Sequence, residues 1–305
     1  MIFRVPNDIK FSHFYRKLNI LSLIFIIFSI LVLLFKGLNL GVDFKGGTLI
    51  ELRTENSMTS IAEIRQSFLK MNLGDVTVKK FGKENDYLAK IEITKSDDEN
   101  FIKSINDKLS ADLGSQINFR RVENVGPKVS KELLRAGLLA ISLSLAAMLF
   151  YIWIRFEWQF SLGAIIALIH DVIITVGIFS FLSYEVNLSI VAAVLTIVGY
   201  SMNDTVVIFD RVRENLKKYS KISISEISDL STNQTLSRTL ITSVTTLLAL
   251  FSIYIFGGAI LKGFSFAMII GVIVGTYSSI FVATPILNYT NVNQKTILKK
   301  DNENN

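Results

Sequence analysis

Long stretches without a charged side chain restrict this chain to a membrane-spanning fold. Residues 18–35, 136–154, 239–261 and 263–294 contain no Asp, Glu, Lys or Arg. The shortest of these stretches has 18 residues, which reach about 27 Å as an α-helix and nearly cross the ~30 Å hydrocarbon core of a bilayer. A chain of 305 residues that is 50% hydrophobic and only 19% charged is too apolar for an ordinary soluble protein.

Two further stretches, 158–184 and 186–209, are apolar apart from internal acidic residues, so the sequence predicts six transmembrane helices. A cleaved signal peptide is the alternative for 18–35. That stretch exceeds the usual signal-peptide core, and no small-x-small cleavage site follows Phe35, so we expect a retained helix. The expected segments are an N-terminal tail (1–17), helix 18–36, an outer domain (37–132), helices 133–155, 158–184 and 186–210, a loop (211–238), helices 239–259 and 263–287, and a C-terminal tail (288–305).

The distribution of basic residues predicts the orientation, because Lys and Arg in short connections stay on the cytoplasmic side. Fourteen lie in the two tails, at Arg155 and in the loop 211–238, against Lys262 alone in the short loops of the opposite side. Both termini are therefore expected in the cytoplasm and 37–132 outside. The net charge of +6 is mostly this topology signal and gives no case for a nucleic-acid partner.

The segment 37–132 has the pattern of a small α+β domain. Strands are expected at 47–53, 76–81, 87–93 and 117–122, and helices at 61–71 and after Ser96-x-x-Glu99. Ser60-x-x-Glu63 forms a capping box for the first helix, whose inward face would carry Ile61, Ile64, Phe68 and Met71. The order β-α-β-β-α-β predicts a ferredoxin-like domain, in which two helices cover one face of a four-stranded sheet.

Catalytic and cofactor-binding patterns are missing from the sequence. It has no cysteine and two histidines, His13 and His170, and lacks nucleophile-elbow, Walker and zinc-binding patterns. We therefore expect neither an enzyme nor a bound metal or organic cofactor.

Acidic residues inside the predicted spans are the sharpest functional signal, since each must be protonated, paired or hydrated there. Asp171 is the middle residue of 158–184 and follows His170. Because successive helix residues are ~100° apart, the two need not face the same surface. Two interpretations remain open for them: a buried polar pair that bonds a neighbouring helix, or a part of an ion path.

Asp204 lies within the polar stretch Gly199-Tyr200-Ser201-Met202-Asn203-Asp204-Thr205 of an otherwise apolar helix. The next candidate counter-charge is Arg238, and antiparallel neighbouring helices could bring the two together. We interpret Asp204 as an ion-coupling carboxyl group, with an orienting ion pair as the alternative. Asp210 is interpreted as a helix-end residue beside the loop, with ion coupling as its alternative.

Glycine-containing patterns mark the junctions between the outer domain and the spans. Gly41-Val42-Asp43-Phe44-Lys45-Gly46-Gly47-Thr48 is not a phosphate-binding loop, because its lysine precedes two glycines and a strand follows. We interpret it as a tight turn after the first span. Gly126-Pro127 suits the start of the second span, and Gly271-x-x-x-Gly275 permits close helix packing.

Taken together, these patterns resemble the SecD/SecF family of bacterial protein-export membrane proteins, and its SecF members in particular. The matching patterns are Gly41 to Thr48, Val125-Gly126-Pro127, Ala167-Leu168-Ile169-His170-Asp171-Val172, Gly199 through Arg211, and Ser237-Arg238-Thr239. They occur in the family's order, and the long pattern that contains Gly199, Asn203 and Asp204 is the most specific.

The resemblance implies half of a six-plus-six helix bundle of the resistance-nodulation-division (RND) type, with SecD supplying the other half. It implies a cytoplasmic (inner) membrane location and association with the SecYEG channel, SecA, YajC-type accessory subunits and a translocating preprotein. The implied activity uses the proton-motive force to complete translocation after the ATP-driven SecA stage. Asp204 and Arg238 match the family's ion-coupling acid and its basic partner, and one carboxylate serves H⁺ or Na⁺.

Two other functions fit the same residues. One is half of a small-molecule exporter of the same superfamily, although an outer domain of this size is small for a substrate cleft. The other is a passive scaffold that stabilises a translocation channel without ion coupling.

Overall fold

The computed structural model of this chain describes residues 9–55, 59–81, 84–92, 99–219, 221–290, 292–294 and 296–297. Six of its helical segments are long and apolar enough to span a membrane, as expected from the sequence. These segments are Phe11–Lys36, Pro127–Arg155, Trp158–Phe181, Leu188–Lys218, Ile224–Phe256 and Ile260–Tyr289. The protein is a helical membrane protein with a small α+β region between its first and second spans.

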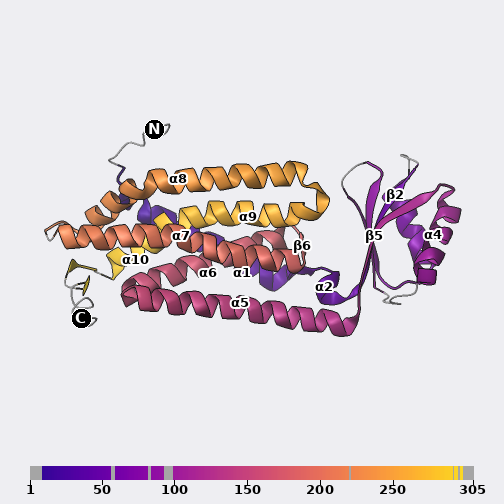
Figure 1. Cartoon of the computed structure of the whole chain (residues 1–305), viewed down its shortest axis with the longest axis horizontal. Helices are drawn as coiled ribbons and strands as arrows, with labels where there is room; N and C mark the ends of the chain where they lie inside the picture. Colours follow the sequence, from indigo (N-terminus) through magenta and orange to yellow (C-terminus); the bar gives the residue numbers. More distant parts are fainter. Residues whose placement is uncertain are drawn as a thin grey trace. The chain divides into compact units, whose positions relative to one another are not determined.

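Figure 1 shows the elements along the chain. The helical part consists of η1 (Phe11–Phe14), α1 (Tyr15–Lys36), α5 (Pro127–Arg155), α6 (Trp158–Phe181), α7 (Leu188–Lys218), α8 (Ile224–Phe256), α9 (Gly258–Ser278), η2 (Ser279–Ala283) and α10 (Thr284–Tyr289). The α+β part consists of α2 (Val42–Lys45), β2 (Gly47–Thr54), α3 (Ile61–Lys70), β3 (Val76–Lys80), β4 (Asp86–Ile91), α4 (Glu99–Leu113) and β5 (Ile117–Val125). Two short strands, β1 (Asn39–Leu40) and β6 (Glu185–Val186), pair with each other.

The chain divides into two compact units. One, the outer domain, comprises Leu40–Leu139 together with Glu185–Leu188. The other, the bundle, comprises Met1–Asn39, Ala140–Tyr184 and Ser189–Asn305. The inclusion of 185–188 in the outer domain was not expected, because the sequence predicts that 186–188 begin the fourth span.

Helices α7 and α8 extend further than the expected spans. The segment 211–238, expected as a loop, is helical up to Lys218 and again from Ile224. A capping box at Ser223 and Glu226 begins α8, since each residue's side chain bonds the backbone N–H of the other. The polar ends of both helices are held together by side-chain bonds, for example from Asn215 Nδ2 to Ser231 Oγ at 2.9 Å.

Within the bundle, α6, α7 and α9 bury the largest share of their surface, whereas α1 and α5 leave most of theirs uncovered. Small residues permit the close packing. A Cβ atom added to Gly271 would lie 2.3 Å from Ile197 Cγ1, and one added to Gly275 would lie 3.0 Å from Ser201 Cβ. The predicted role of Gly271-x-x-x-Gly275 in helix packing is therefore confirmed, with α7 as the packing partner.

The sixth span is interrupted by the π-helical turn η2, directly after Ser278. Pro285 explains the interruption, because it has no N–H for the carbonyl of Phe281 and its ring excludes regular α-helix at that carbonyl. The Thr284 hydroxyl instead donates to the Ser279 carbonyl at 2.8 Å. The last turns of this span, α10, therefore follow a π-helical turn instead of continuing α9 as a regular α-helix.

The outer domain has the ferredoxin-like order predicted from the sequence. Its sheet is ordered β3-β4-β2-β5, and each neighbouring pair is antiparallel. The side chains of Ile50, Tyr87 and Ile91 on the strands are buried with Ile64, Phe68, Ile105 and Leu109 of α3 and α4. One core therefore fills the space between the sheet and its two helices.

The helix ends and buried faces that the sequence predicts for this domain can be compared with the structure. The capping box Ser60-x-x-Glu63 is present, and Gly114 ends α4 with a positive φ of 58°. Ile61, expected on the buried face of α3, is instead 37% exposed in the first turn. The expected capping box at Ser96, and Ile93 at the end of the third predicted strand, lie outside the described residues.

Candidate functional site

Asp171, at the centre of α6, is fully buried and accepts three hydrogen bonds. His170 Nδ1 lies 2.8 Å from Asp171 Oδ1. The hydroxyl groups of Ser201 and Ser278 both donate to Oδ2, at 2.5 and 2.8 Å. Since these donors lie on α6, α7 and α9, one carboxylate connects three helices of the bundle.

The polar contacts continue from Asp171 along α7 and η2. The Thr205 and Ser279 hydroxyls are 2.9 Å apart, and both residues are fully buried. Ser279 Oγ also donates to the Gly275 carbonyl at 2.9 Å. The interior of the bundle therefore contains a connected set of buried polar side chains, which we call the Asp171 network: His170, Asp171, Ser201, Thr205, Ser278 and Ser279.

The side chains of His170 and Asp171 contact each other, a question that the ~100° rotation between successive helix residues left open. Its ring also stacks on Tyr277, with centroids 6.1 Å apart and an interplanar angle of 24°. The Tyr277 hydroxyl donates to the Leu18 carbonyl at 2.8 Å and thereby connects this region to α1. His170 Nε2 is buried and has no hydrogen-bond partner within the described part of the chain.

Asp204 lies one turn from Ser201 on α7 and has a different environment. Its side chain is 3% exposed, and Oδ2 has no hydrogen-bond partner among the described residues. The charge of Arg238 on α8 acts on this carboxylate, yet the two described side chains form no direct ion pair. The structure thus brings the predicted pair into electrostatic range without contact between them.

Polar side chains near Asp204, on α7 and on α8, are left uncovered by the chain itself. Asn203 and Arg238 are exposed in the isolated chain. Tyr200 Oη donates to Thr246 Oγ1 at 3.3 Å and joins α7 to α8. Gly199 has open space around it, since an added Cβ would meet only Met148 Cε, at 3.9 Å.

Asp210 forms an ion pair with Arg155 at 2.8 Å, and both side chains are more than 40% exposed. A second ion pair, Arg213 to Glu157 at 3.0 Å, lies one turn further along α7 and is largely buried. Asp210 was expected at a helix end, but α7 continues for eight more residues to Lys218. Both pairs tie α7 to the turn between α5 and α6.

The turn after the first span depends on two consecutive glycines. Gly46 and Gly47 have φ angles of 78° and 119°, which favour glycine. A Cβ on Gly46 would approach the Val125 carbonyl to 3.2 Å, and a Cβ on Gly47 would lie 2.5 Å from the Ile91 carbonyl. Phe44 is buried, and Asp43 accepts a hydrogen bond from Leu188 N at 2.9 Å. The segment interpreted as a tight turn contains one short helix, α2, followed by these two glycines.

The corresponding junction at the other end of the domain follows β5 directly. Pro127 is the first residue of α5, and the Ser130 N–H donates to the Gly126 carbonyl at 2.9 Å. Proline suits this position because its missing N–H has no partner at a helix start.

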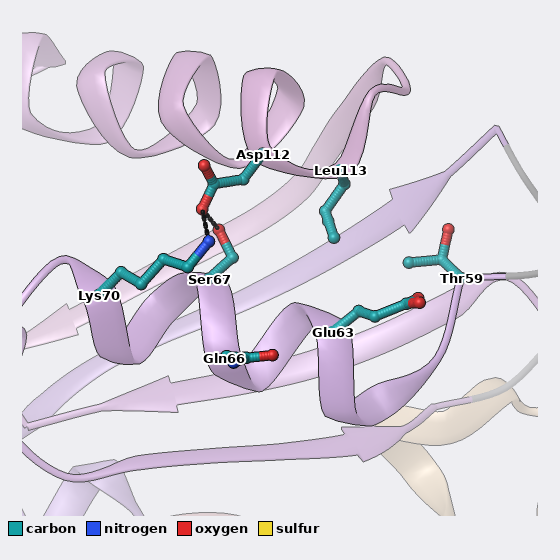
Figure 2. Close-up of a pocket in the computed structure, with 7 residues that line it drawn as sticks. All are labelled: Thr59, Glu63, Gln66, Ser67, Lys70, Asp112 and Leu113. Atoms are coloured by element: carbon teal, nitrogen blue, oxygen red, sulfur yellow. Dashed lines mark hydrogen bonds and ion pairs between the residues drawn. The ribbon is translucent and has the colours of Figure 1, made fainter.

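A pocket of about 350 Å³ opens between α3 and α4 in the outer domain. Figure 2 shows that Lys70 and Ser67 both point toward Asp112 across it. Lys70 Nζ lies 3.3 Å and Ser67 Oγ 2.8 Å from the same carboxylate oxygen, and these contacts lower the pKa of Asp112. These groups bond one another across the pocket and form a polar tie between the two helices.

Comparison with known proteins decides the family. The model for "Protein export membrane protein SecD/SecF, C-terminal" matches residues 105–293. Protein translocase subunit SecF of Rickettsia bellii is 43% identical over 288 residues, which cover 93% of this chain and 94% of that protein. The chain belongs to the SecF family. The SecF subunit of Vibrio alginolyticus is similarly close, with 44% identity over 288 residues covering 93% of this chain and 90% of that protein.

Solved SecDF structures share the fold of this SecF chain. The crystal structure of SecDF from Thermus thermophilus, described as a translocon-associated membrane protein, matches with a TM-score of 0.85 and 32% identity. The match covers 96% of this chain and 40% of that longer chain. SecDF in its super-membrane-facing form matches with a TM-score of 0.69 and the same identity.

The SecD/SecF "GG Motif" model matches residues 31–58 and therefore includes Gly46 and Gly47. The structure gives a physical reason for two glycines there, since the first packs against β5 and the second against the end of β4. Among the residues that bond or pack around His170 and Asp171, sequence reasoning missed Tyr277, Ser278 and Ser279. Three consecutive polar residues in an apolar span were the available signal.

Proposed function

We propose that this SecF subunit works with SecD to complete protein translocation across the cytoplasmic membrane, driven by the proton-motive force after the ATP-dependent SecA stage. Asp204 would be the ion-coupling carboxyl group and Arg238 its basic partner. The ion is taken to be H⁺, with Na⁺ as the alternative that the test below separates.

The observation that carries this proposal is the contrast between two buried acids. Asp171 accepts three hydrogen bonds and is held in place by them. Asp204 is almost as deeply buried, but its Oδ2 has no hydrogen-bond partner among the described residues. A carboxyl group of this kind can gain or lose an ion without breaking contacts inside the chain.

Arg238 supports the assignment through its position. Its charge acts on Asp204 without a direct ion pair. Binding of a proton at Asp204 would remove that attraction, and α7 could then shift relative to α8. One proton that crosses 100 mV releases ~2.3 kcal/mol, which biases a two-state bundle but requires repeated cycles to move a polypeptide.

SecD is the expected partner because the matching SecDF chain is longer and this chain spans 40% of it. Exposed polar side chains at Asn203 and Arg238 also favour a covering protein partner, since lipid would leave them unsatisfied. Further partners proposed from the family are the SecYEG channel, SecA, YajC-type accessory subunits and the translocating preprotein.

The orientation proposed places both termini in the cytoplasm and the outer domain outside. Fourteen basic residues lie in the segments assigned to the cytoplasm, and one lies in the short loops of the opposite side. Accessibility of introduced cysteines to an impermeant reagent tests this directly, because the native chain contains none.

The test compares wild type with Asp204→Asn in vesicles that contain SecD, SecF, SecYEG and SecA. Wild type should complete export of a preprotein faster when a proton gradient is imposed, and Asp204→Asn should lose most of that acceleration while still co-purifying with SecD. Glu214→Gln, on the exposed end of the same helix, is the matched control and should retain it.

Each alternative function has its own outcome in this assay. Full gradient-dependent export by Asp204→Asn would support a passive scaffold and refute ion coupling. Gradient-dependent efflux of a small solute, without an effect on preprotein, would support an exporter. Acceleration by a sodium gradient but not by a proton gradient would change the proposed ion.

A further inference from the structure

Asp43 of the Gly41–Thr48 segment contacts the start of α7, 145 residues away. Its Oδ2 accepts a hydrogen bond of 2.9 Å from the backbone N–H of Leu188, the first residue of that helix. The N–H groups of a first helical turn have no partner within the helix, and a carboxylate there is favoured by the helix dipole. Asp43 therefore acts as a cap supplied by a distant part of the chain.

Several contacts hold Asp43 in this position. The short strands β1 and β6 pair beside it, and the Gly41 N–H donates to the Val186 carbonyl at 2.8 Å. Gly41 lies close to the same strand, because an added Cβ would lie 2.7 Å from Glu185 Oε1 and 3.3 Å from Asn187 Cβ. Val42 and Phe44, on either side of Asp43, are buried.

Three residues further along, the same segment enters the sheet. Gly46 packs against the Val125 carbonyl, and Gly47 begins β2 where an added Cβ would lie 2.5 Å from the Ile91 carbonyl oxygen. Residues 41–47 are thus fixed at one end to the first turn of α7 and at the other end to the sheet of the outer domain.

Helix α7 belongs to both compact units. Leu188 groups with the outer domain, whereas the helix from Ser189 onward groups with the bundle. Asp204 follows Leu188 by 16 residues, about 24 Å along a continuous α-helix. The α7 residue that is capped by Asp43 and the residue proposed to bind the ion therefore lie on one continuous helix.

We propose that Asp43 is a positioning residue that couples α7 to the outer domain, so that a displacement of α7 at Asp204 is transmitted to the ferredoxin-like sheet through the capped first turn and residues 41–47. This inference rests on the proposed function of Asp204. It assigns to residues 41–47 a mechanical task that a passive connection would not have.

Substitutions at Asp43 can distinguish the effect of its hydrogen bond to Leu188 from the effect of its negative charge. Asn keeps a side-chain oxygen at the same reach as Asp but carries no charge, whereas Ala removes the acceptor. If the cap transmits the movement, Asp43→Asn should retain gradient-dependent export, and Asp43→Ala should lower its rate about fivefold. If the negative charge itself matters, Asp43→Asn should fail like Asp43→Ala, which would overturn the proposal.

Spectroscopic distances give a readout that a purely structural role would not change. Cysteines are introduced at Thr77 in β3 and at Tyr219 after α7, both exposed, in a chain without native cysteine. Spin labels at these sites should report a distance change between the Asp204 protein and the Asp204→Asn protein. The change should persist with Asp43→Asn and disappear with Asp43→Ala, while all variants keep the thermal stability needed to co-purify with SecD.

The outcomes distinguish this proposal from the proposed function. An unchanged distance response in Asp43→Ala, with full export, refutes the coupling role of Asp43 alone. Normal gradient-dependent export by Asp204→Asn refutes the ion-coupling function itself, whatever Asp43→Ala does. If Asp43→Ala does not fold, Asp43→Asn still decides between cap and charge, because loss of both its distance response and its gradient-dependent export would refute the cap.

Discussion

The Ser278 hydroxyl donates a hydrogen bond of 2.8 Å to the Asp171 carboxylate, although the two residues are 107 positions apart in the sequence. Because Ser201 and His170 bond the same carboxylate, Asp171 holds α6, α7 and α9 together. Asp204, one turn away from Ser201, has no comparable set of donors among the described residues. Asp171 and Asp204, both buried in this bundle, are therefore expected to respond differently to the same substitution.

Asp171→Asn should destabilise the protein by about 1–3 kcal/mol, since buried donors lose part of their acceptor. Ser278→Ala should cost about 0.5–2 kcal/mol, the usual range for one bond between membrane helices. Thermal unfolding of the purified SecF–SecD complex measures both, and Asp204→Asn serves as the comparison with little expected change. Unaltered stability in Asp171→Asn together with lost ion dependence would place Asp171 on the ion path instead.

Gly271→Ala should destabilise the bundle by about 1–3 kcal/mol, because its new methyl group would lie 2.3 Å from Ile197 Cγ1. Reducing the neighbour in the double variant Gly271→Ala with Ile197→Ala should recover part of this loss. Gly199→Ala is the matched control on α7, where only Met148 Cε lies nearby, at 3.9 Å. Equal unfolding temperatures for the two single variants would contradict the close packing of α7 on α9.

Gly47→Ala should unfold the junction between the turn and β2. The residue has φ of 119°, and an added Cβ would lie 2.5 Å from the Ile91 carbonyl. Backbone strain of this kind costs about 1–3 kcal/mol before the clash is counted. Gly126→Ala, with open space at its Cβ position, should be tolerated. Limited proteolysis of the outer domain measures both, and similar protection would argue against the strain.

Ionised Asp112 should stabilise the outer domain at neutral pH, and this stabilisation should disappear at strongly acidic pH. The Ser67 hydroxyl and Lys70 lower its pKa below the ordinary value of 3.8. A carboxyl group with a lowered pKa in the folded state stabilises that state above its unfolded pKa and loses this effect as pH falls through the folded pKa. The stability difference between wild type and Asp112→Asn should therefore be present at pH 7 and vanish well below pH 3.8. A difference that stays constant with pH would exclude this ionic contribution.

Much of the outer domain could be predicted because its signals are local. Alternation in Tyr87, Ala89 and Ile91 gave the buried face of β4, and the spacing of Ile105 and Leu109 gave the buried face of α4. The two-residue and helical periods are properties of neighbouring residues, so no tertiary information was needed. The prediction that Ile61 is buried was wrong because it also used local spacing alone. Spacing gives the face of the helix, but it does not show whether the sheet extends far enough to cover the first turn of α3.

The Asp171 network could not be predicted in this way. Its bonds depend on how α6, α7 and α9 are rotated about their own axes, and Ser278 is far from Asp171 in the sequence. Periodicity gives the rotation of an amphipathic helix, but a span that is apolar on every side carries little such information. The contact of Asp43 with Leu188 was hidden for a related reason, since a capping acid is normally sought next to the helix that it caps.

The two compact units are joined within continuous helices as well as at short connections. The boundaries at Leu139–Ala140 and Leu188–Ser189 lie inside α5 and α7. Gly137 lies two residues before the boundary in α5, whereas α7 has no glycine until Gly199. Because glycine weakens a helix interior, α5 should bend more easily than α7 at these crossings.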